Sequence, residues 1–148
     1  DLIRDGKQSN TPHYGRMNMF FYDPKGKKTL PYYDTFPLVI PIERYPDGFL
    51  GINFHYLPMA LRLRLLDRIV DFSNNTKFDE TTVIDADYPK LKNLKEIKPT
   101  LKRYLAGRVK TRFRRVDADE FTVAALLPIA RWKKGTQEQV YRDSRRMI

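Results

Sequence analysis

The segment LVIPIERYPDGFLGINF, residues 38–54, decides the fold because two apolar, strand-forming runs flank a turn signal. The turn signal is the tetrapeptide YPDG at residues 45–48, and this order predicts a β-hairpin. Proline has no N–H to donate to a neighbouring strand, so Pro41 indicates an edge strand or a bulge. Gly51 indicates a bend or a close approach of two backbones.

The residues before the hairpin predict more antiparallel sheet. Residues 17–22 (MNMFFY) are typical of a strand, and the turn signal DPKG at 23–26 predicts that this strand enters a hairpin with the residues that follow. Residues 31–37 contain too much proline for a central strand, so we expect an extended, aromatic-rich connection there. Residues 17–56 together predict a curled, barrel-like antiparallel sheet of three or four strands.

Helices are predicted in the second half of the chain. Pro58 suits the first turn of a helix over residues 58–72, whose apolar rows face a core. Asp87 is a credible N-cap, and a capping-box pattern precedes each of the predicted helices at 121–127 and after Thr136. Strands first and helices after indicate the α+β class, with a curled antiparallel sheet packed against several helices. We expect one domain over residues 17–148, preceded by an extended arm over residues 1–16 that orders against a partner.

Positive charge is concentrated in residues 90–115, which contain eleven Lys or Arg and one acidic residue, Glu96. The net charge of this stretch, +10, equals that of the whole chain, so the remaining residues sum to zero. A concentrated charge favours one polyanionic partner, because the field over a surface is the sum of nearby charges. We predict that one face contacts phosphates through Lys98, Lys102, Arg103, Arg108, Lys110, Arg112, Arg114 and Arg115. The alternative is that these are ordinary solvated charges.

The apolar residues of the basic stretch predict how it is presented. Leu101, Tyr104, Leu105 and Val109 fall on one face of a helix, so we expect a basic helix that begins near Pro99. A short strand should follow over residues 112–116, with Phe113 turned inward.

Composition and motifs favour a binding protein over an enzyme. The chain has no Cys, which excludes disulfides and thiolate chemistry, and it has no phosphate-binding glycine loop or serine nucleophile motif. We therefore expect no cofactor and no small-molecule substrate. No apolar run is long enough to cross a membrane and the N-terminus is polar, so neither a membrane span nor a signal peptide is expected.

Three sets of residues could still carry chemistry. Asp85 with Glu96 and Lys98 matches the pattern of a metal-dependent nuclease, but a helical setting would separate the last two around the axis. His55, at a strand-to-helix corner, favours a structural hydrogen bond over catalysis. Tyr residues near the basic stretch could stack on bases, although packing is the commoner use: Tyr32, Tyr33, Tyr45, Tyr56 and Tyr104.

Several segments resemble a family of small proteins from large contractile-tailed bacteriophages (myoviruses), the DNA end protectors. The resemblance is carried by MFFYDPKGKKTLPYYD at 19–34, by GFLGINFHYLP at 48–58, by KRYL at 102–105 and VKTRF at 109–113, and by DSRR at 143–146. It implies a non-enzymatic virion protein that binds packaged DNA or sits in the head, neck or baseplate.

Two functions remain open. One is sequence-independent DNA binding in the phage particle, of the DNA end protection type. The other is a structural head-neck, tail or baseplate component whose basic face docks on acidic protein neighbours, and a metal-dependent nuclease ranks third. Residues 1–16 and 31–37 are least able to bury themselves, so we expect them to contact other virion subunits.

Overall fold

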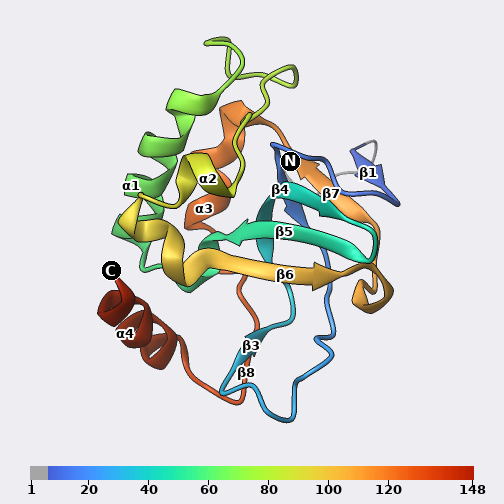
Figure 1. Cartoon of the computed structure of the whole chain (residues 1–148), viewed down its shortest axis with the longest axis vertical. Helices are drawn as coiled ribbons and strands as arrows, with labels where there is room; N and C mark the ends of the chain where they lie inside the picture. Colours follow the sequence, from blue (N-terminus) through green and yellow to red (C-terminus); the bar gives the residue numbers. More distant parts are fainter. Residues whose placement is uncertain (1–6) are drawn as a thin grey trace.

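An open antiparallel sheet of six strands lies at the centre of the computed structural model, which describes residues 7–148 (Figure 1). The strands lie in the order β1, β7, β2, β4, β5, β6. Their bounds are β1 Gln8–Ser9, β2 Met17–Met19, β4 Leu38–Tyr45, β5 Gly48–Asn53, β6 Leu101–Leu105 and β7 Phe113–Val116. A separate two-stranded sheet pairs β3 (Tyr33–Asp34) with β8 (Trp132–Lys133).

Helices cover one face of the large sheet (Figure 1). Their bounds are α1 Met59–Ile69, α2 Tyr88–Leu91, α3 Phe121–Leu126 and α4 Gln137–Met147. Short 3-10 turns span Phe54–Tyr56, Val70–Phe72, Lys95–Thr100, Ala106–Arg108 and Ala118–Glu120. The core under α1 and α3 joins Leu65, Ile69 and Phe121 to Met19 and Ile52 of the sheet. α4 lies apart from these helices, near the small sheet.

The opposite face of the sheet carries a second, mostly aromatic core. Phe20, Tyr22, Phe49, Tyr104 and Phe113 are all buried there, and their rings meet mainly edge to face. No long helix of the described residues covers this face. The N-terminal segment at Tyr14 and the β6–β7 loop at Val109 close over it instead.

The predicted hairpin is confirmed as β4 and β5. The register shifts between Pro41 and Glu43, which is the irregularity that Pro41 indicated. The close approach at Gly51 is also confirmed, because a Cβ there would lie 2.3 Å from Val39 Cγ1. Gly48 meets β6 in the same way: a Cβ there would lie 1.8 Å from the Tyr104 carbonyl oxygen. Only glycine lets β5 approach its two neighbours so closely.

The predicted helix signals at Asp87 and Thr136 are confirmed. The Asp87 side chain accepts a hydrogen bond from the Lys90 N–H at the start of α2, and Thr136 Oγ1 accepts one from the Gln139 N–H at the start of α4. The first capping box behaves differently, because Asp117 uses its carboxylate to bind Lys7 and Arg115. The helix over residues 58–72 is α1 with a 3-10 extension.

The α+β class is confirmed, but the curled, barrel-like shape is wrong because the sheet is open. The predicted hairpin after residues 17–22 is also wrong. β2 pairs with β4 and β7, while the residues after Gly26 make a turn in which the Thr29 N–H donates to the Gly26 carbonyl oxygen. Residues 27–30 follow the turn signal at 23–26, but they form no strand.

The predicted basic helix near Pro99 is wrong, because residues 101–105 form strand β6 and pair with β5. Leu101 packs against the helix-covered core and Tyr104 belongs to the aromatic core. Apolar residues buried on both faces of a strand can produce the spacing of a helix face. The strand predicted over residues 112–116 is confirmed as β7, with Phe113 buried.

The predicted arm over residues 1–16 is described only from residue 7, and its first six residues lie outside the described part. Gln8–Ser9 pairs with β7, and the Gly15 N–H donates to the Pro41 carbonyl oxygen. Residues 7–16 therefore lie against their own sheet. The boundary at residue 16 stays a prediction. No helix among the described residues has the length and apolarity to cross a membrane.

Candidate nucleic-acid interface

The loop between β6 and β7, residues 106–112, is fixed to the segment that follows β2. Arg108 donates from Nε to the Asp23 carbonyl oxygen and from Nη2 to Asp23 Oδ2, at 2.7 and 2.9 Å. The Lys110 N–H donates to the Phe21 carbonyl oxygen, and the Phe21 N–H donates to Thr111 Oγ1. These bonds hold the loop backbone in place and leave the side chains of Lys110 and Arg112 exposed.

Two pockets flank this loop. The Phe21 pocket, of about 890 Å³, has walls from Phe20, Phe21, Phe36 and residues 127–130, and its cations are Arg112, Arg114 and Arg131. The Tyr14 pocket, of about 660 Å³, is lined by Tyr14, Tyr45 and Phe49 together with the cations Arg44, Lys110 and Arg112. Among the described residues, no Asp or Glu lines either pocket. As far as the described residues show, the linings of the two pockets therefore combine positive charge with aromatic rings.

The floor of the Phe21 pocket is an aromatic pair. The Phe21 ring lies 4.5 Å from the Phe36 ring between centroids, and Phe21 remains 37% exposed. The Arg131 guanidinium lies 5.4 Å from the centre of the Phe21 ring. In the Tyr14 pocket, Arg44 lies over the Tyr14 ring at 4.6 Å. Each pocket thus combines an arginine with an aromatic ring.

The predicted phosphate-binding residues do not share one face. Side chains alternate along a strand, so Lys102 lies on the aromatic side of β6 and Arg103 on the other. On β7, Arg114 pairs with Met19 and Arg115 with Asn18, again on opposite faces. The structure brings Lys110, Arg112 and Arg114 together at the pockets.

Three of the other predicted residues form local ion pairs. Arg103 pairs with Asp47 and lies over Tyr45, Arg108 pairs with Asp23, and Arg115 shares Asp117 with Lys7. Lys98 is exposed in the 3-10 turn before β6, at the opposite end of that strand from the loop. Whether any of the eight residues contacts DNA stays a prediction.

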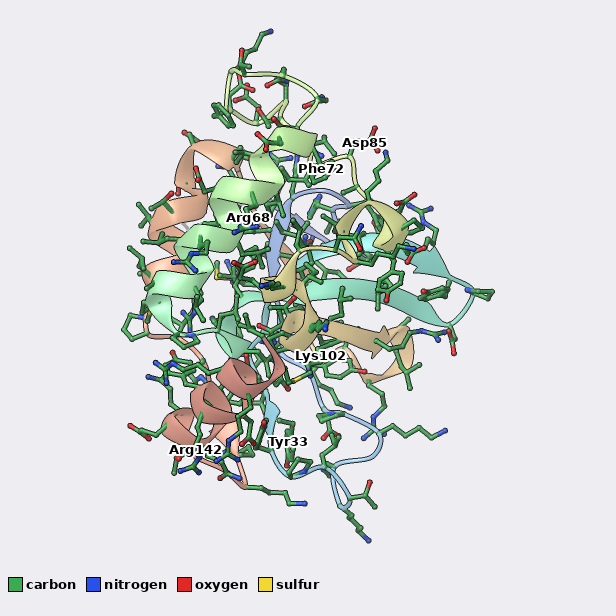
Figure 2. The ribbon with its side chains drawn as sticks, turned by 60° about the vertical axis from the view of Figure 1, so that its left-hand side comes forward. Tyr33, Arg68, Phe72, Asp85, Lys102 and Arg142 are labelled. Carbon is green, nitrogen blue, oxygen red and sulfur yellow. The ribbon has the colours of Figure 1, made fainter. Side chains whose placement is uncertain are left out.

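Lys102 is the predicted site residue least available to a partner. Its ammonium lies 4.0 Å from the centre of the Tyr56 ring, and Figure 2 shows it near the middle of the molecule. Burial lowers the pKa of Lys102 to about 8. A phosphate would have to reach a partly buried cation that is already held by an aromatic face.

Sequence reasoning missed Arg44, Arg131, Phe21 and Phe36. Arg44 and Arg131 lie outside the basic stretch, and the two Phe residues belong to segments that were assigned to a strand and a connection. The only sequence signal is that Phe21 is the third apolar residue in a row in MFFY. Side chains alternate along a strand, so Phe21 should lie on the opposite face from Phe20, which faces the core.

The nuclease pattern is not assembled. Asp85 is exposed, whereas Glu96 is buried in the 3-10 turn and pairs with Arg68 on α1. No group of three potential metal ligands occurs within residues 7–148. Glu96 and Lys98 occupy the same short turn, where Glu96 is buried and Lys98 exposed.

The structural role predicted for His55 is confirmed. His55 Nδ1 lies 2.6 Å from Asp34 Oδ2, and both side chains are buried. The packing role predicted for the tyrosines holds for Tyr56 and Tyr104, which are buried within aromatic contacts. Tyr32 donates to Asp143 Oδ2 and so ties the Pro-rich connection to α4.

These features define a basic α+β protein whose exposed cations and aromatic rings suit a polyanion. A family model described as the phage T4 terminal DNA protecting protein matches residues 1–144. The chain belongs to this family, which is a non-enzymatic protector of DNA ends, and it is therefore a phage protein that binds DNA ends. No curated protein and no solved structure matches the chain.

Proposed function

We propose that the DNA end is held by the loop at residues 106–112 and the two pockets beside it, through phosphate contacts that do not depend on sequence. The observation that supports this most is the lining of the pockets, which carries Arg44, Lys110, Arg112 and Arg131 and, within residues 7–148, no acidic residue. Phosphates favour such a surface because binding releases their condensed counterions. The proposal replaces Lys102, Arg103, Arg108 and Arg115 as the main contacts, since these four are engaged elsewhere.

Sequence independence is supported by what surrounds the loop. The pockets are lined by loops and strand ends. Neither of the two long helices, α1 and α4, contributes a residue to them. Base-specific readout commonly places Asn, Gln or Arg of a helix or strand ribbon at base edges in the major groove. The cations here lie around the pockets, where phosphates of any sequence would meet them.

The first prediction concerns the salt dependence of binding. Replacing Lys110, Arg112 and Arg131 by Ala should flatten the slope of log affinity against log salt by about three units, because each neutralised phosphate contributes about 0.9. Fluorescence titration of a linear duplex at several salt concentrations measures the slope, and unrelated sequences should give the same change.

A matched control removes the same charge elsewhere. Lys90, Lys92 and Lys98 are exposed on the segment before β6, at the end of that strand away from the loop. Their triple Ala variant should leave the slope nearly unchanged. Equal flattening in both variants would mean that only total charge matters and would reject this site.

We also propose that the protein is carried in the virion and bound to other virion subunits. A protein that protects DNA ends has to be present where the ends are, which supports a place in the particle. Contact with other subunits through residues 1–16 and 31–37 is supported at Asn10, Thr11 and Pro31, which are exposed. Asp34 and Pro37 give it no support, because both are buried. Cross-linking of purified particles followed by mass spectrometry would identify the neighbours, and absence from the particle would reject the proposal.

A further inference from the structure

We infer that the Phe21 pocket binds the terminal nucleotide of the DNA, with its base stacked on Phe21 and its phosphates near Arg112 and Arg131. This inference rests on the proposed function and adds a reason why an end would be preferred. Continuous duplex presents phosphates everywhere, but only an end offers the open face of a base. A site for ends therefore needs an accessible aromatic or apolar platform next to cations.

Phe21 has the properties of such a platform. It is 37% exposed, yet the Phe36 ring supports it at 4.5 Å and the Arg131 guanidinium lies 5.4 Å from its centre. Its position is fixed by two hydrogen bonds of its backbone, since its carbonyl oxygen accepts from the Lys110 N–H and its N–H donates to Thr111 Oγ1. A ring held in this way loses little freedom when a base stacks on it.

The pocket has the size and lining for one nucleotide. Its volume of about 890 Å³ falls within the range of small-ligand sites, and its walls are mostly apolar. Arg112 and Arg131 are both exposed at this pocket, and no described acidic residue lines it. An apolar wall with arginines beside it matches the two halves of a nucleotide, the base and the phosphate.

The experiment compares DNA with and without ends. Binding of the full chain is measured to a linear duplex and to a covalently closed circle of the same sequence and length, at one salt concentration. The wild type should prefer the linear form. Phe21→Ala should weaken binding to the linear duplex about tenfold, the size expected for one lost base–aromatic contact, and should change binding to the circle less than twofold.

Three variants separate stacking from other effects. Phe21→Trp should keep the preference, since it retains an aromatic face. Phe21→Leu, which keeps apolar contact with Phe36, should lose it as Phe21→Ala does. Phe78→Ala removes another Phe that is 37% exposed but lies outside the pocket, and it should behave as the wild type. Circular dichroism and thermal melting confirm that each variant is folded.

The outcomes distinguish this inference from the proposed function. If Phe21→Ala weakens binding to both forms equally, or to neither, the stacking inference is overturned while phosphate binding stands. If Phe21→Leu keeps the preference, apolar packing and not stacking explains it, and the inference also fails. If the wild type binds neither form in a salt-dependent way, the proposed function itself is rejected.

Discussion

Asp34 is an acceptor for four donors at the junction of the two sheets. Its carboxylate accepts from the N–H groups of Phe36 and Arg131 and from Asn53 Nδ2, and it contacts His55 Nδ1. Burial opposes ionisation, but the bonds from His55 and the two backbone N–H groups outweigh it and lower the pKa of Asp34. Arg131, a cation of the Phe21 pocket, is thus positioned by the same carboxylate.

We predict that Asp34→Ala lowers the free energy of unfolding by about 3–5 kcal/mol, because it leaves several buried donors without an acceptor. Asp34→Asn should cost less, since it retains one acceptor oxygen. Urea unfolding measures the loss, with Asp71→Ala as an exposed control that should change stability by less than about 0.5 kcal/mol. A cost below about 1 kcal/mol for Asp34→Ala would show that the network adds little.

Lys102 leads to a prediction about pH. The unfolded chain binds its proton up to a pKa near 10.5, whereas the folded chain releases it near pH 8. Between these pH values the unfolded state holds more protons than the folded state. Lys102 should therefore make the free energy of unfolding increase as the pH rises. Lys102→Met should remove the rise and should be more stable than the wild type at pH 7.

The measurement compares the free energies of unfolding of wild type and Lys102→Met at pH 7 and 9.5. The advantage of the Met variant should shrink by at most about 2 kcal/mol over this interval, given 1.36 kcal/mol for each pKa unit. A constant difference would mean that Lys102 stays protonated in the folded state. The same variant should keep the salt slope of DNA binding, since Lys102 lies outside both pockets.

The sequence predicts single residues best when their partners are near in the chain. The bonds from Lys90 to Asp87 and from Gln139 to Thr136 each span three positions, and both caps were predicted. The Phe21 pocket instead joins β2, the Pro-rich connection, the β6–β7 loop and residues 127–131. No local pattern indicates that Phe21 and Arg131 will meet, because the topology of the whole chain decides it.

Among the elements, α4 depends on its cap and on its contacts with the rest of the domain. Thr136 Oγ1 accepts from Gln139 N–H at 3.1 Å, Val140 is buried, and Ser144 Oγ donates to the Tyr56 carbonyl oxygen. We predict that Thr136→Ala destabilises the protein by about 1 kcal/mol. Thr122→Ala, at an exposed position inside α3, should be neutral or slightly stabilising because Ala favours helix. Thermal melting of both variants measures the contrast, and equal effects would argue against the cap.

The basic segment shows why an element can be predicted wrongly. Spacing alone fits a helix for Leu101, Tyr104 and Leu105, but two facts that the sequence does not display favour a strand. Without β6, β5 would have an unpaired edge, and a strand placed at that edge contacts an apolar core on each of its faces. Tertiary pairing therefore overrides the local pattern.

For the whole molecule, the order of strands and helices was enough to predict the α+β class, whereas the order of strands within the sheet was not. β2 precedes β4 in sequence and also pairs with it, as a meander would. The insertion of β7 between β1 and β2 joins residues 113–116 to the N-terminal segment, and no pattern near residues 8–19 indicates it. The charge of the pockets depends on this insertion, because it carries Arg112 next to the segment after β2.

Because β7 separates β1 from β2, the growing chain cannot complete its sheet during most of its synthesis. Met17–Met19 can pair with β4 soon after residue 45 has left the ribosome, but its other edge waits for residues 113–116. Pairings between such distant segments form slowly, and an apolar strand edge that stays open is prone to aggregation. Nascent chains that end before residue 113 should therefore be the aggregating species, whereas the finished chain covers that edge with its own strand.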